Sequence, residues 1–345
     1  MLGLPGAIEP GSYQSKILKT SAMLPFIGGY YAVKDYVLAG GFYALGGGGG
    51  KWEDSVSDAL ASNINASLKG ECGYMVGNLS IAKKVNEKMS VGAGLNYIYI
   101  LDEVNVEKEY QASDTALSSG ISNYNFTLKR DGSGSAIGFI LGTMCEPAEK
   151  IKIGLALRSG ASVKLRGKAS YVQSGLTALG YPDADVETDY DQNYAYPMTY
   201  DIGFAYVPID ALTLAFSITR ADYSVLKDDF DYKTEVAGVL TDGNTSWKWK
   251  DTTEINTGAE YRLNQKFSVA GGVIFDPNPV PNDKLTFLKT NQYDLIVPNV
   301  GFGYTSGQLR LEFNRSFCIS DKPSKGDRSQ ELSGGSYLLN LAYNF

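Results

Sequence analysis

The sequence contains no histidine among its 345 residues. That absence excludes Ser-His-Asp and Cys-His catalysis, histidine-ligated zinc or haem, and an imidazole general base. The three cysteines, Cys72, Cys145 and Cys318, are an odd number without the spacing of metal ligands, so neither a disulfide framework nor a zinc site is indicated. We therefore expect no enzyme, no cofactor and no bound metal.

Long apolar runs and basic clusters are missing as well. No segment approaches the ~18 to 20 apolar residues that a membrane-spanning helix needs. The net charge is −7 without a basic run, which argues against nucleic acid as a partner. The N-terminus lacks the charged-then-apolar layout of a secretory signal. Glycine, with 39 residues, and tyrosine, with 24, are abundant instead. These counts do not exclude a membrane β-barrel.

Alternation with a period of two residues recurs along the chain and indicates β-strands. In residues 151–158 one face is aliphatic (Ile151, Ile153, Leu155 and Leu157), while the other carries Lys152, Gly154, Ala156 and Arg158. The last strand has an unbroken apolar face that ends on an aromatic residue: Tyr337, Leu339, Leu341, Tyr343 and Phe345. Long aliphatics on one face and small or polar residues on the other are typical of a lipid-facing wall around a polar interior.

Thirteen candidate strands follow from this alternation. They cover 22–33, 36–46, 72–84, 89–101, 134–145, 151–165, 196–207, 211–223, 251–262, 267–275, 297–305, 308–318 and 335–345. Short connections alternate with long ones, which we expect to be loops over 47–71, 102–133, 166–195, 224–250, 276–296 and 319–334. Short turns on one side and long loops on the other are expected of an antiparallel transmembrane β-barrel in the bacterial outer membrane.

The odd strand number bears on the organisation of the chain. Single-chain bacterial barrels normally have an even number of strands, so one N-terminal strand is expected to be missing or hidden before residue 22. We therefore divide the chain into an N-terminal segment, 1–21, and a barrel, 22–345. A miscounted strand is the alternative.

Several of these segments resemble the FadL/TodX family of outer-membrane transporters for long-chain fatty acids and other hydrophobic compounds. The most specific is FDPNPVPND, which is similar to the family's Asp-x-Ser-Pro-Val-Pro segment. The matching residues are Asp276, Pro277, Pro279, Val280 and Pro281, with Asn278 in place of Ser. Leu157, Arg158 and Ser159 stand where the family has Tyr-Arg-Ser.

The resemblance implies a fourteen-stranded barrel, an N-terminal hatch that plugs it, and passive uptake of a hydrophobic small molecule, with long-chain fatty acids as the first candidates. The family's Asn-Pro-Ala hatch motif is absent from this sequence, which puts the plug in doubt. We expect a monomer surrounded by outer-membrane lipids. The alternative function is a structural or adhesive surface barrel whose long loops bind a host or matrix component.

Charged residues on the inward phase are candidates for ligand binding. They are Arg158, Arg262, Arg310, Asp201, Glu260 and Glu312. A guanidinium inside an apolar lumen could hold a fatty-acid carboxylate through a forked contact. The alternative is a ladder of paired charges that stiffens the wall, since Glu260 and Arg262, and Arg310 and Glu312, are neighbours on one face.

Glycine and acidic runs are weaker signals. Gly40 and Gly41 lie inside a strand, where paired glycines often mark a bulge or kink that could open the wall, or simply allow close packing. Gly46 to Gly50 followed by Lys51 lacks the first glycine and the Ser or Thr of a phosphate-binding loop. The alternating acidic residues of 183–191 could attract a hard cation, but solvated loop charge is the default.

Overall fold

The structure is a computed structural model. It describes residues 16–17, 24–56, 61–114, 117, 123–175, 177, 182–237, 239–284, 293–322, 324–325, 328–329 and 332–345. In these residues no helix is long and apolar enough to cross a membrane. The expected division at residue 21 falls mostly on residues outside the described ranges.

Nearly all of the described chain is β-strand, and most of it forms one sheet of 20 strands. The strands are β1 (Lys16–Ile17), β2 (Phe26–Val33), β3 (Tyr36–Val56), β4 (Ala61–Asn86), β5 (Met89–Ala112), β6 (Tyr124–Ala148), β7 (Ile151–Arg158), β8 (Ala161–Ser174), β9 (Ala184–Tyr196), β10 (Thr199–Ile209), β11 (Leu212–Ala221), β12 (Lys227–Tyr232), β13 (Gly243–Ser246), β14 (Thr252–Arg262), β15 (Phe267–Asp276), β16 (Leu295–Ser306), β17 (Leu309–Ser316), β18 (Cys318–Ser320), β19 (Ser324–Lys325), β20 (Arg328–Ser329), β21 (Ser333–Gly334) and β22 (Tyr337–Tyr343). Two short 3-10 helices, η2 (Tyr223–Val225) and η3 (Asn282–Lys284), lie in connections.

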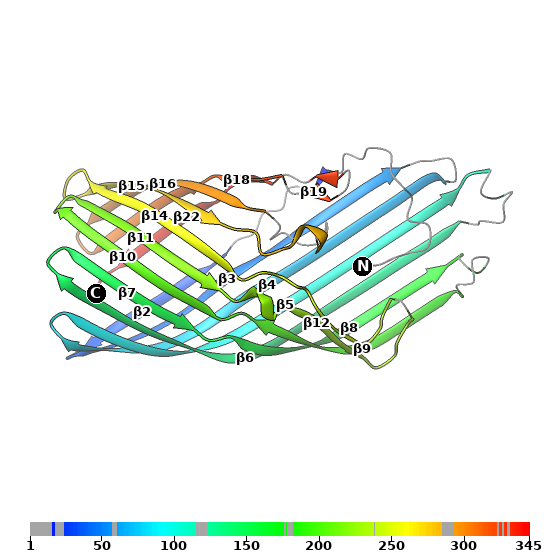
Figure 1. The fold of residues 1–345 in the computed structure, drawn as a ribbon, viewed down its shortest axis with the longest axis horizontal. Helices are drawn as coiled ribbons and strands as arrows, with labels where there is room; N and C mark the ends of the chain where they lie inside the picture. Colours follow the sequence, from blue (N-terminus) through cyan, green and yellow to red (C-terminus); the bar gives the residue numbers. More distant parts are fainter. Residues whose placement is uncertain are drawn as a thin grey trace.

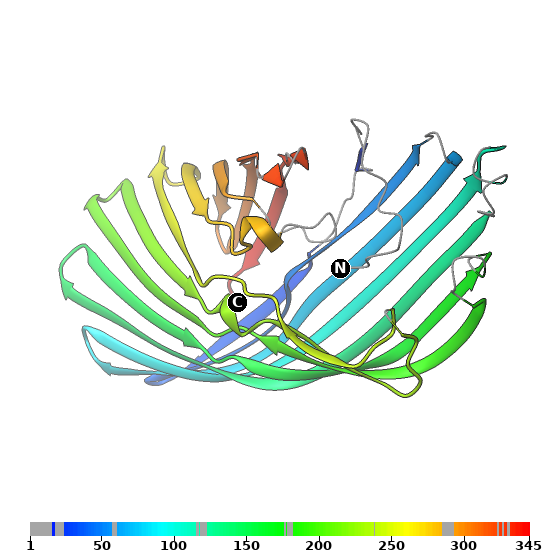
Figure 2. The same ribbon diagram turned by 45° about the vertical axis from the view of Figure 1, so that its right-hand side comes forward.

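Antiparallel pairing links the long strands into a continuous curved wall (Figures 1 and 2). Its order is β2-β3-β4-β5-β6-β7-β10-β11-β14-β15-β16-β17-β22. Each of the thirteen segments expected from alternation overlaps one of these strands, but segment 151–165 is not a single strand, because β7 ends at Arg158 and β8 begins at Ala161. Because every neighbouring pair is antiparallel, the first and the thirteenth strand run in the same direction.

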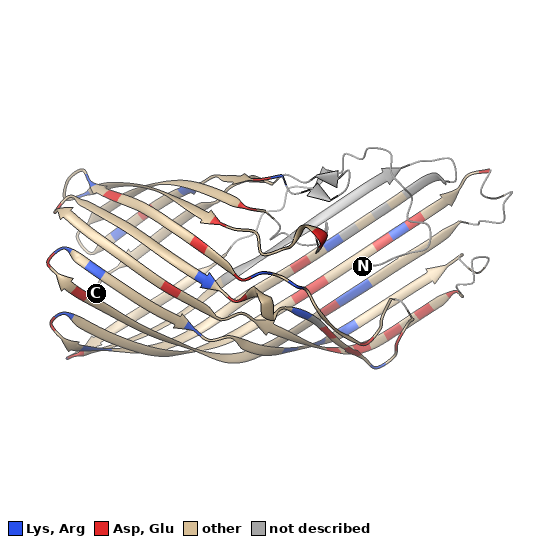
Figure 3. Cartoon of the chain, in the orientation of Figure 1, with Lys and Arg blue, Asp and Glu red and all other residues tan. Residues whose placement is uncertain are grey.

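Three of the expected long loops are instead largely strand. Segments 47–71, 102–133 and 166–195 extend β3 to β6 and form β8 and β9, which continue beyond the ends of β10 and β14 (Figure 1). These extensions alternate polar with apolar residues; in β5, for example, exposed Glu103 and Glu107 alternate with half-buried Val104 and Val106. The prediction of loops here was wrong because the extensions carry many charged residues (Figure 3) and lack the aliphatic outer face by which the other strands were recognised.

One long arm of the wall is interrupted between β7 and β8. β6 pairs with β7 over its C-terminal part and with β8 over its N-terminal part, so Ser159 and Gly160 join two segments of one arm. The pairing register runs unbroken through Gly40 and Gly41, and the irregularity of β3 lies further on, between Ala44 and Gly46. The irregularity of β3 therefore comes three residues after Gly41, and the kink predicted at Gly40 and Gly41 is not found there.

The two faces of the wall follow the predicted phase. Leu95, Ile137 and Ile202 point outward and are 61%, 64% and 53% exposed. Inward-facing neighbours such as Asn96 and Ile98 are buried. The outer face around the middle of the wall is thus an apolar band of the kind that contacts lipid.

The two edges of the wall are open. Among the described residues, β2 pairs with β3 alone and β22 pairs with β17 alone. Every residue of β2 is exposed, and Leu339 in β22 is 75% exposed. The sheet is therefore curved but not closed.

Candidate functional site in the interior of the wall

Small residues line the interior at the end of the wall away from the strand extensions. One row crosses four neighbouring strands through Gly154, Gly203, Ser217 and Asn256, which are register partners. A hollow of about 410 Å³ includes these residues in its lining. A Cβ built on Gly154 or on Gly203 would meet no atom within 4 Å. Small side chains thus leave free space along this part of the interior.

Arg158 and Asp201 lie on the inward phase, as expected, and form an ion pair. The second oxygen of Asp201 accepts a hydrogen bond from the Thr219 hydroxyl at 2.7 Å. The side chains of Arg158 and Asp201 are 36% and 24% exposed. The charge of this arginine is therefore matched by a neighbouring strand rather than left free for a ligand.

Arg310 is the centre of a second inward network. Its guanidinium contacts Glu260 at 3.2 Å and Glu312 at 2.6 Å. Glu312 also accepts a hydrogen bond from Asn340 of β22 at 3.0 Å. No ion pair of Arg262 is found among the described residues. The six predicted residues thus form two separate networks with Arg262 apart, which gives the paired-ladder alternative a geometric basis.

An apolar cluster fills the interior where the extended strands begin. Its fully buried members are Val76, Ile98, Ile100, Val163 and Leu165. The Tyr74 and Tyr194 hydroxyls meet beside it at 2.7 Å, joining β4 to β9. Three strands, β5, β6 and β8, separate β4 from β9 along the wall, so this contact crosses the interior.

Aromatic contacts continue from Tyr194 into the connections after β11 and β13. The ring of Tyr194 meets Trp247 edge-on at 6.3 Å between centroids, and Trp247 lies 5.0 Å from Trp249. Trp249 in turn contacts Tyr223 of η2 at 6.1 Å. We call these five residues, Tyr74, Tyr194, Trp247, Trp249 and Tyr223, the aromatic bridge.

A second buried cluster occupies the far end of the extended strands. It contains Phe126, Tyr171, Tyr190, Tyr232 and Leu240. Arg130 enters this cluster with its guanidinium 4.4 Å from the Phe230 ring centroid and 3.5 Å from Asp102. Burial raises the pKa of the Tyr190 phenol, so this group stays neutral at ordinary pH. We call this group the far-end cluster.

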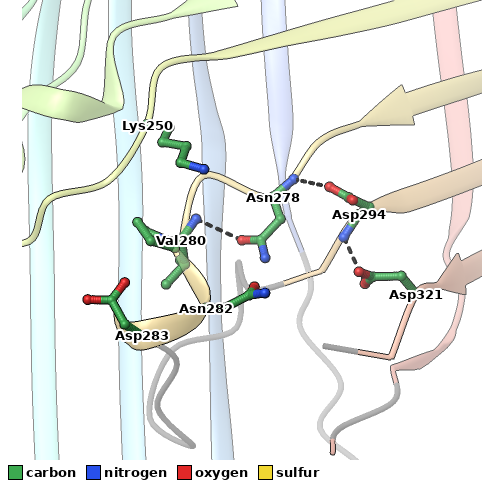
Figure 4. Close-up of a pocket in the computed structure, with 8 residues that line it drawn as sticks. Lys250, Asn278, Val280, Asn282, Asp283, Asp294 and Asp321 are labelled. Atoms are coloured by element: carbon green, nitrogen blue, oxygen red, sulfur yellow. Dashed lines mark hydrogen bonds between the residues drawn. The ribbon is translucent and has the colours of Figure 1, made fainter. Parts of the chain in front are cut away.

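The segment FDPNPVPND forms an ordered turn at the end of β15 (Figure 4). The backbone N–H of Asn278 donates to Asp294 at 2.7 Å, and the Val280 N–H donates to the Asn278 side chain at 2.8 Å. The Lys250 N–H donates to the Pro279 carbonyl at 2.8 Å. Val280 is buried against Trp249 and Leu226. The segment thus anchors the connection that carries the bridge tryptophans, and a polar hollow of about 510 Å³ lies beside it.

The acidic residues of 185–191 lie on the outer face of β9 and not in a loop. Asp191 contacts Lys164 at 2.7 Å and Glu187 contacts Lys168 at 2.9 Å, both on β8. The hydrogen bond from Lys164 holds the pKa of the Asp191 carboxyl below its ordinary value. No cluster of His, Cys, Asp or Glu suited to a metal ion occurs in the described residues.

The tyrosines of β9 were missed by the sequence analysis. Tyr190, which lies between Asp189 and Asp191, and Tyr194 and Tyr196 further along the strand face inward, where they are buried or half-buried. The available signal was the period of two: the acidic residues occupy odd positions and the tyrosines occupy even positions. It indicated a strand with a polar outer face and an aromatic inner face.

The family model described as "Outer membrane protein transport protein (OMPP1/FadL/TodX)" matches residues 57–339. The chain belongs to this family. The FadL/TodX resemblance inferred from short motifs is thus confirmed, and the chain belongs to a family of outer-membrane transport proteins and not of enzymes.

Curated relatives of this FadL/TodX-family chain are distant. Alkane uptake protein A of Marinobacter nauticus is 32% identical over 119 residues, which are 33% of this chain and 25% of that protein. The chain therefore matches a quarter of that relative's length. Outer membrane protein P1 of Haemophilus influenzae is 20% identical over an alignment that covers 98% of this chain and 79% of that protein.

Solved structures share the fold. A Pseudomonas aeruginosa FadL homologue is 16% identical with a TM-score of 0.68, and the match covers 93% of this chain and 77% of that one. The toluene transporter TbuX of Ralstonia pickettii is 17% identical with a TM-score of 0.67, covering 93% and 81%. These likenesses agree with the antiparallel wall described above.

Proposed function

We propose that this chain forms a passive channel that takes up hydrophobic small molecules across the outer membrane. The observation that carries the proposal is the division of the interior into two parts. Aromatic and aliphatic side chains fill the extended end, where an apolar ligand would find contact surface. Small residues line the opposite end and leave space for passage.

The extended end is proposed to face the cell exterior. Outer-membrane barrels have short turns on the periplasmic side and their longer segments outside. The connections between β2 and β3, β4 and β5, and β10 and β11 are all two-residue turns at the other end. A ligand would therefore reach the aromatic clusters first and the small-residue lining second.

A complete barrel is proposed to contain one strand more than the thirteen of the described wall. Because β2 and β22 run in the same direction, they cannot join as an antiparallel pair. A strand that runs opposite to both would satisfy both edges, and unsatisfied edges are costly in lipid. Fourteen strands, as expected from the family resemblance, meet this condition.

The substrate class follows from the state of the inward charges. Arg158 and Arg310 are both matched by carboxylates, which favours uncharged molecules such as alkanes or single-ring aromatics. The partial likeness to an alkane uptake protein supports the same choice. Long-chain fatty acids, the first candidates from the sequence, are the second proposal, because Arg262 has no ion pair among the described residues.

Uptake of radiolabelled dodecane, toluene and oleate by cells with and without the gene tests the proposal. We expect deletion to lower the rate for at least one of the three and the full-length gene to restore it. Unchanged uptake of all three, together with loop-dependent binding to matrix proteins, would support the adhesive barrel instead.

A further inference from the structure

We propose that the aromatic bridge is the gate of this channel, built from the chain's own wall and connections. The inference rests on the proposed uptake function for its purpose, but its geometry stands apart from the identity of the substrate. The residues of the bridge come from four places that are distant in sequence: β4, β9, η2 and the connection between β13 and β14.

The aromatic bridge crosses the interior. Tyr74 and Tyr194 meet between β4 and β9, which are not neighbours in the wall. From Tyr194 the contacts pass to Trp247 and Trp249, and Trp249 packs on Val280 from the connection after β15. Side chains in contact therefore lead from the extended part of the wall to the connection on its shorter side.

Backbone hydrogen bonds hold the aromatic bridge in place. The Trp247 N–H donates to the Leu226 carbonyl at 3.0 Å, and the Lys250 N–H donates to the Pro279 carbonyl at 2.8 Å. These bonds flank the two tryptophans on either side. Trp249 and Leu226 are 8% and 3% exposed, so Trp249 is seated in a packed site, and Trp247 beside it is half-buried.

The chemistry of the bridge side chains determines which molecules it admits. The rings offer apolar surface, so water and polar solutes that pass between them would lose hydrogen bonds without replacement. A hydrocarbon loses none and can replace one ring contact by another as it moves through. Constrictions of this kind control passage in other channels by excluding water. The bridge would thus keep the pore closed to polar solutes and allow hydrophobic molecules to pass.

The bridge also separates the two parts of the interior. The far-end cluster lies on one side of it, and the row from Gly154 to Asn256 lies on the other. Because the bridge lies between these two parts of the interior, removal of a bridge ring should connect them. Removal of a ring from the far-end cluster should not.

Ion conductance of the purified full chain in planar lipid bilayers tests the gate. We expect Trp249→Ala and Tyr194→Ala to raise conductance about tenfold or more, since the constriction sets the flow. Trp249→Phe and Tyr194→Phe keep a ring and should stay near the wild-type value. Tyr232→Ala is the matched control: Tyr232 is 7% exposed, like Trp249 at 8%, but belongs to the far-end cluster.

Heat-modifiable gel mobility shows which variants are folded. The proposal is overturned if folded Trp249→Ala and Tyr194→Ala conduct like the wild type, or if Tyr232→Ala leaks as much as they do. Hydrocarbon uptake is measured separately. If the wild type takes up no hydrocarbon while Trp249→Ala leaks, the gate stands and the proposed uptake function fails.

Discussion

Replacing Arg158 with Met tests whether the inward arginine serves a ligand or the wall. The substitution leaves Asp201 with the Thr219 hydroxyl as its remaining hydrogen-bond partner. Exposed ion pairs contribute ~0 to 1 kcal/mol, whereas breaking a buried pair costs ~3 to 5 kcal/mol. The side chains are 36% and 24% exposed, so solvent screens the pair and the loss should lie near the lower range, about 1 kcal/mol.

Asp201→Asn and the double variant Arg158→Met/Asp201→Asn complete the cycle. If the pair braces the wall, each single variant should lower the unfolding midpoint in a urea titration and the double variant should recover part of the loss. Binding of oleate and of an uncharged fatty alcohol would then change together.

If Arg158 holds a carboxylate instead, the two ligands separate. A charge-assisted hydrogen bond contributes ~1.5 to 3 kcal/mol, so Arg158→Met should weaken oleate binding roughly ten- to a hundredfold and leave the alcohol unchanged. Asp201→Asn should strengthen oleate binding because it frees the guanidinium. Equal changes for both ligands, measured by fluorescence competition, would refute the ligand role.

Three further outcomes are expected. Gly167→Ala should lower the heat-modification temperature, because its Cβ would overlap the Asp131 carbonyl of the paired strand, whereas Gly203→Ala, with no atom within 4 Å, should be neutral; equal midpoints would contradict the packing argument. Leu155→Arg on the outer face should cost ~2 to 4 kcal/mol near the bilayer midplane, and unchanged stability in liposomes would show that this face does not meet lipid. Deletion of Phe345 should reduce assembly into the outer membrane, since it removes the last ring of the apolar face; normal amounts of folded protein in the membrane fraction would argue against this.

The phase of the strands could be predicted from the residues alone. Side chains in a strand alternate between two faces, so Leu155 and Arg158 had to point to opposite sides once the strand was recognised. A lipid-facing surface also has to be apolar, which identified the outer face. The extensions of β5 and β9 were misassigned because their outer faces are polar and only their inner faces carry an apolar or aromatic pattern.

The partner of an inward charge on another strand could not be predicted in this way. The Arg158 partner, Asp201, is 43 residues away, and Glu260 is 50 residues from Arg310. Adjacent charges in the sequence suggested Glu260 with Arg262, but the register of β14 to β17 brings Arg310 to Glu260 instead. Alternation determines the face of a residue, and the curvature and register of the sheet determine its neighbour.

The aromatic bridge is the clearest case of this difference. Tyr74 and Tyr194 are 120 residues apart and lie on strands that do not pair. No local pattern records how far a sheet curls, because curvature comes from the summed twist and packing of many strands. Alternation can place each tyrosine on an inner face, and only the curvature of the sheet from β4 to β9 brings the two hydroxyls together.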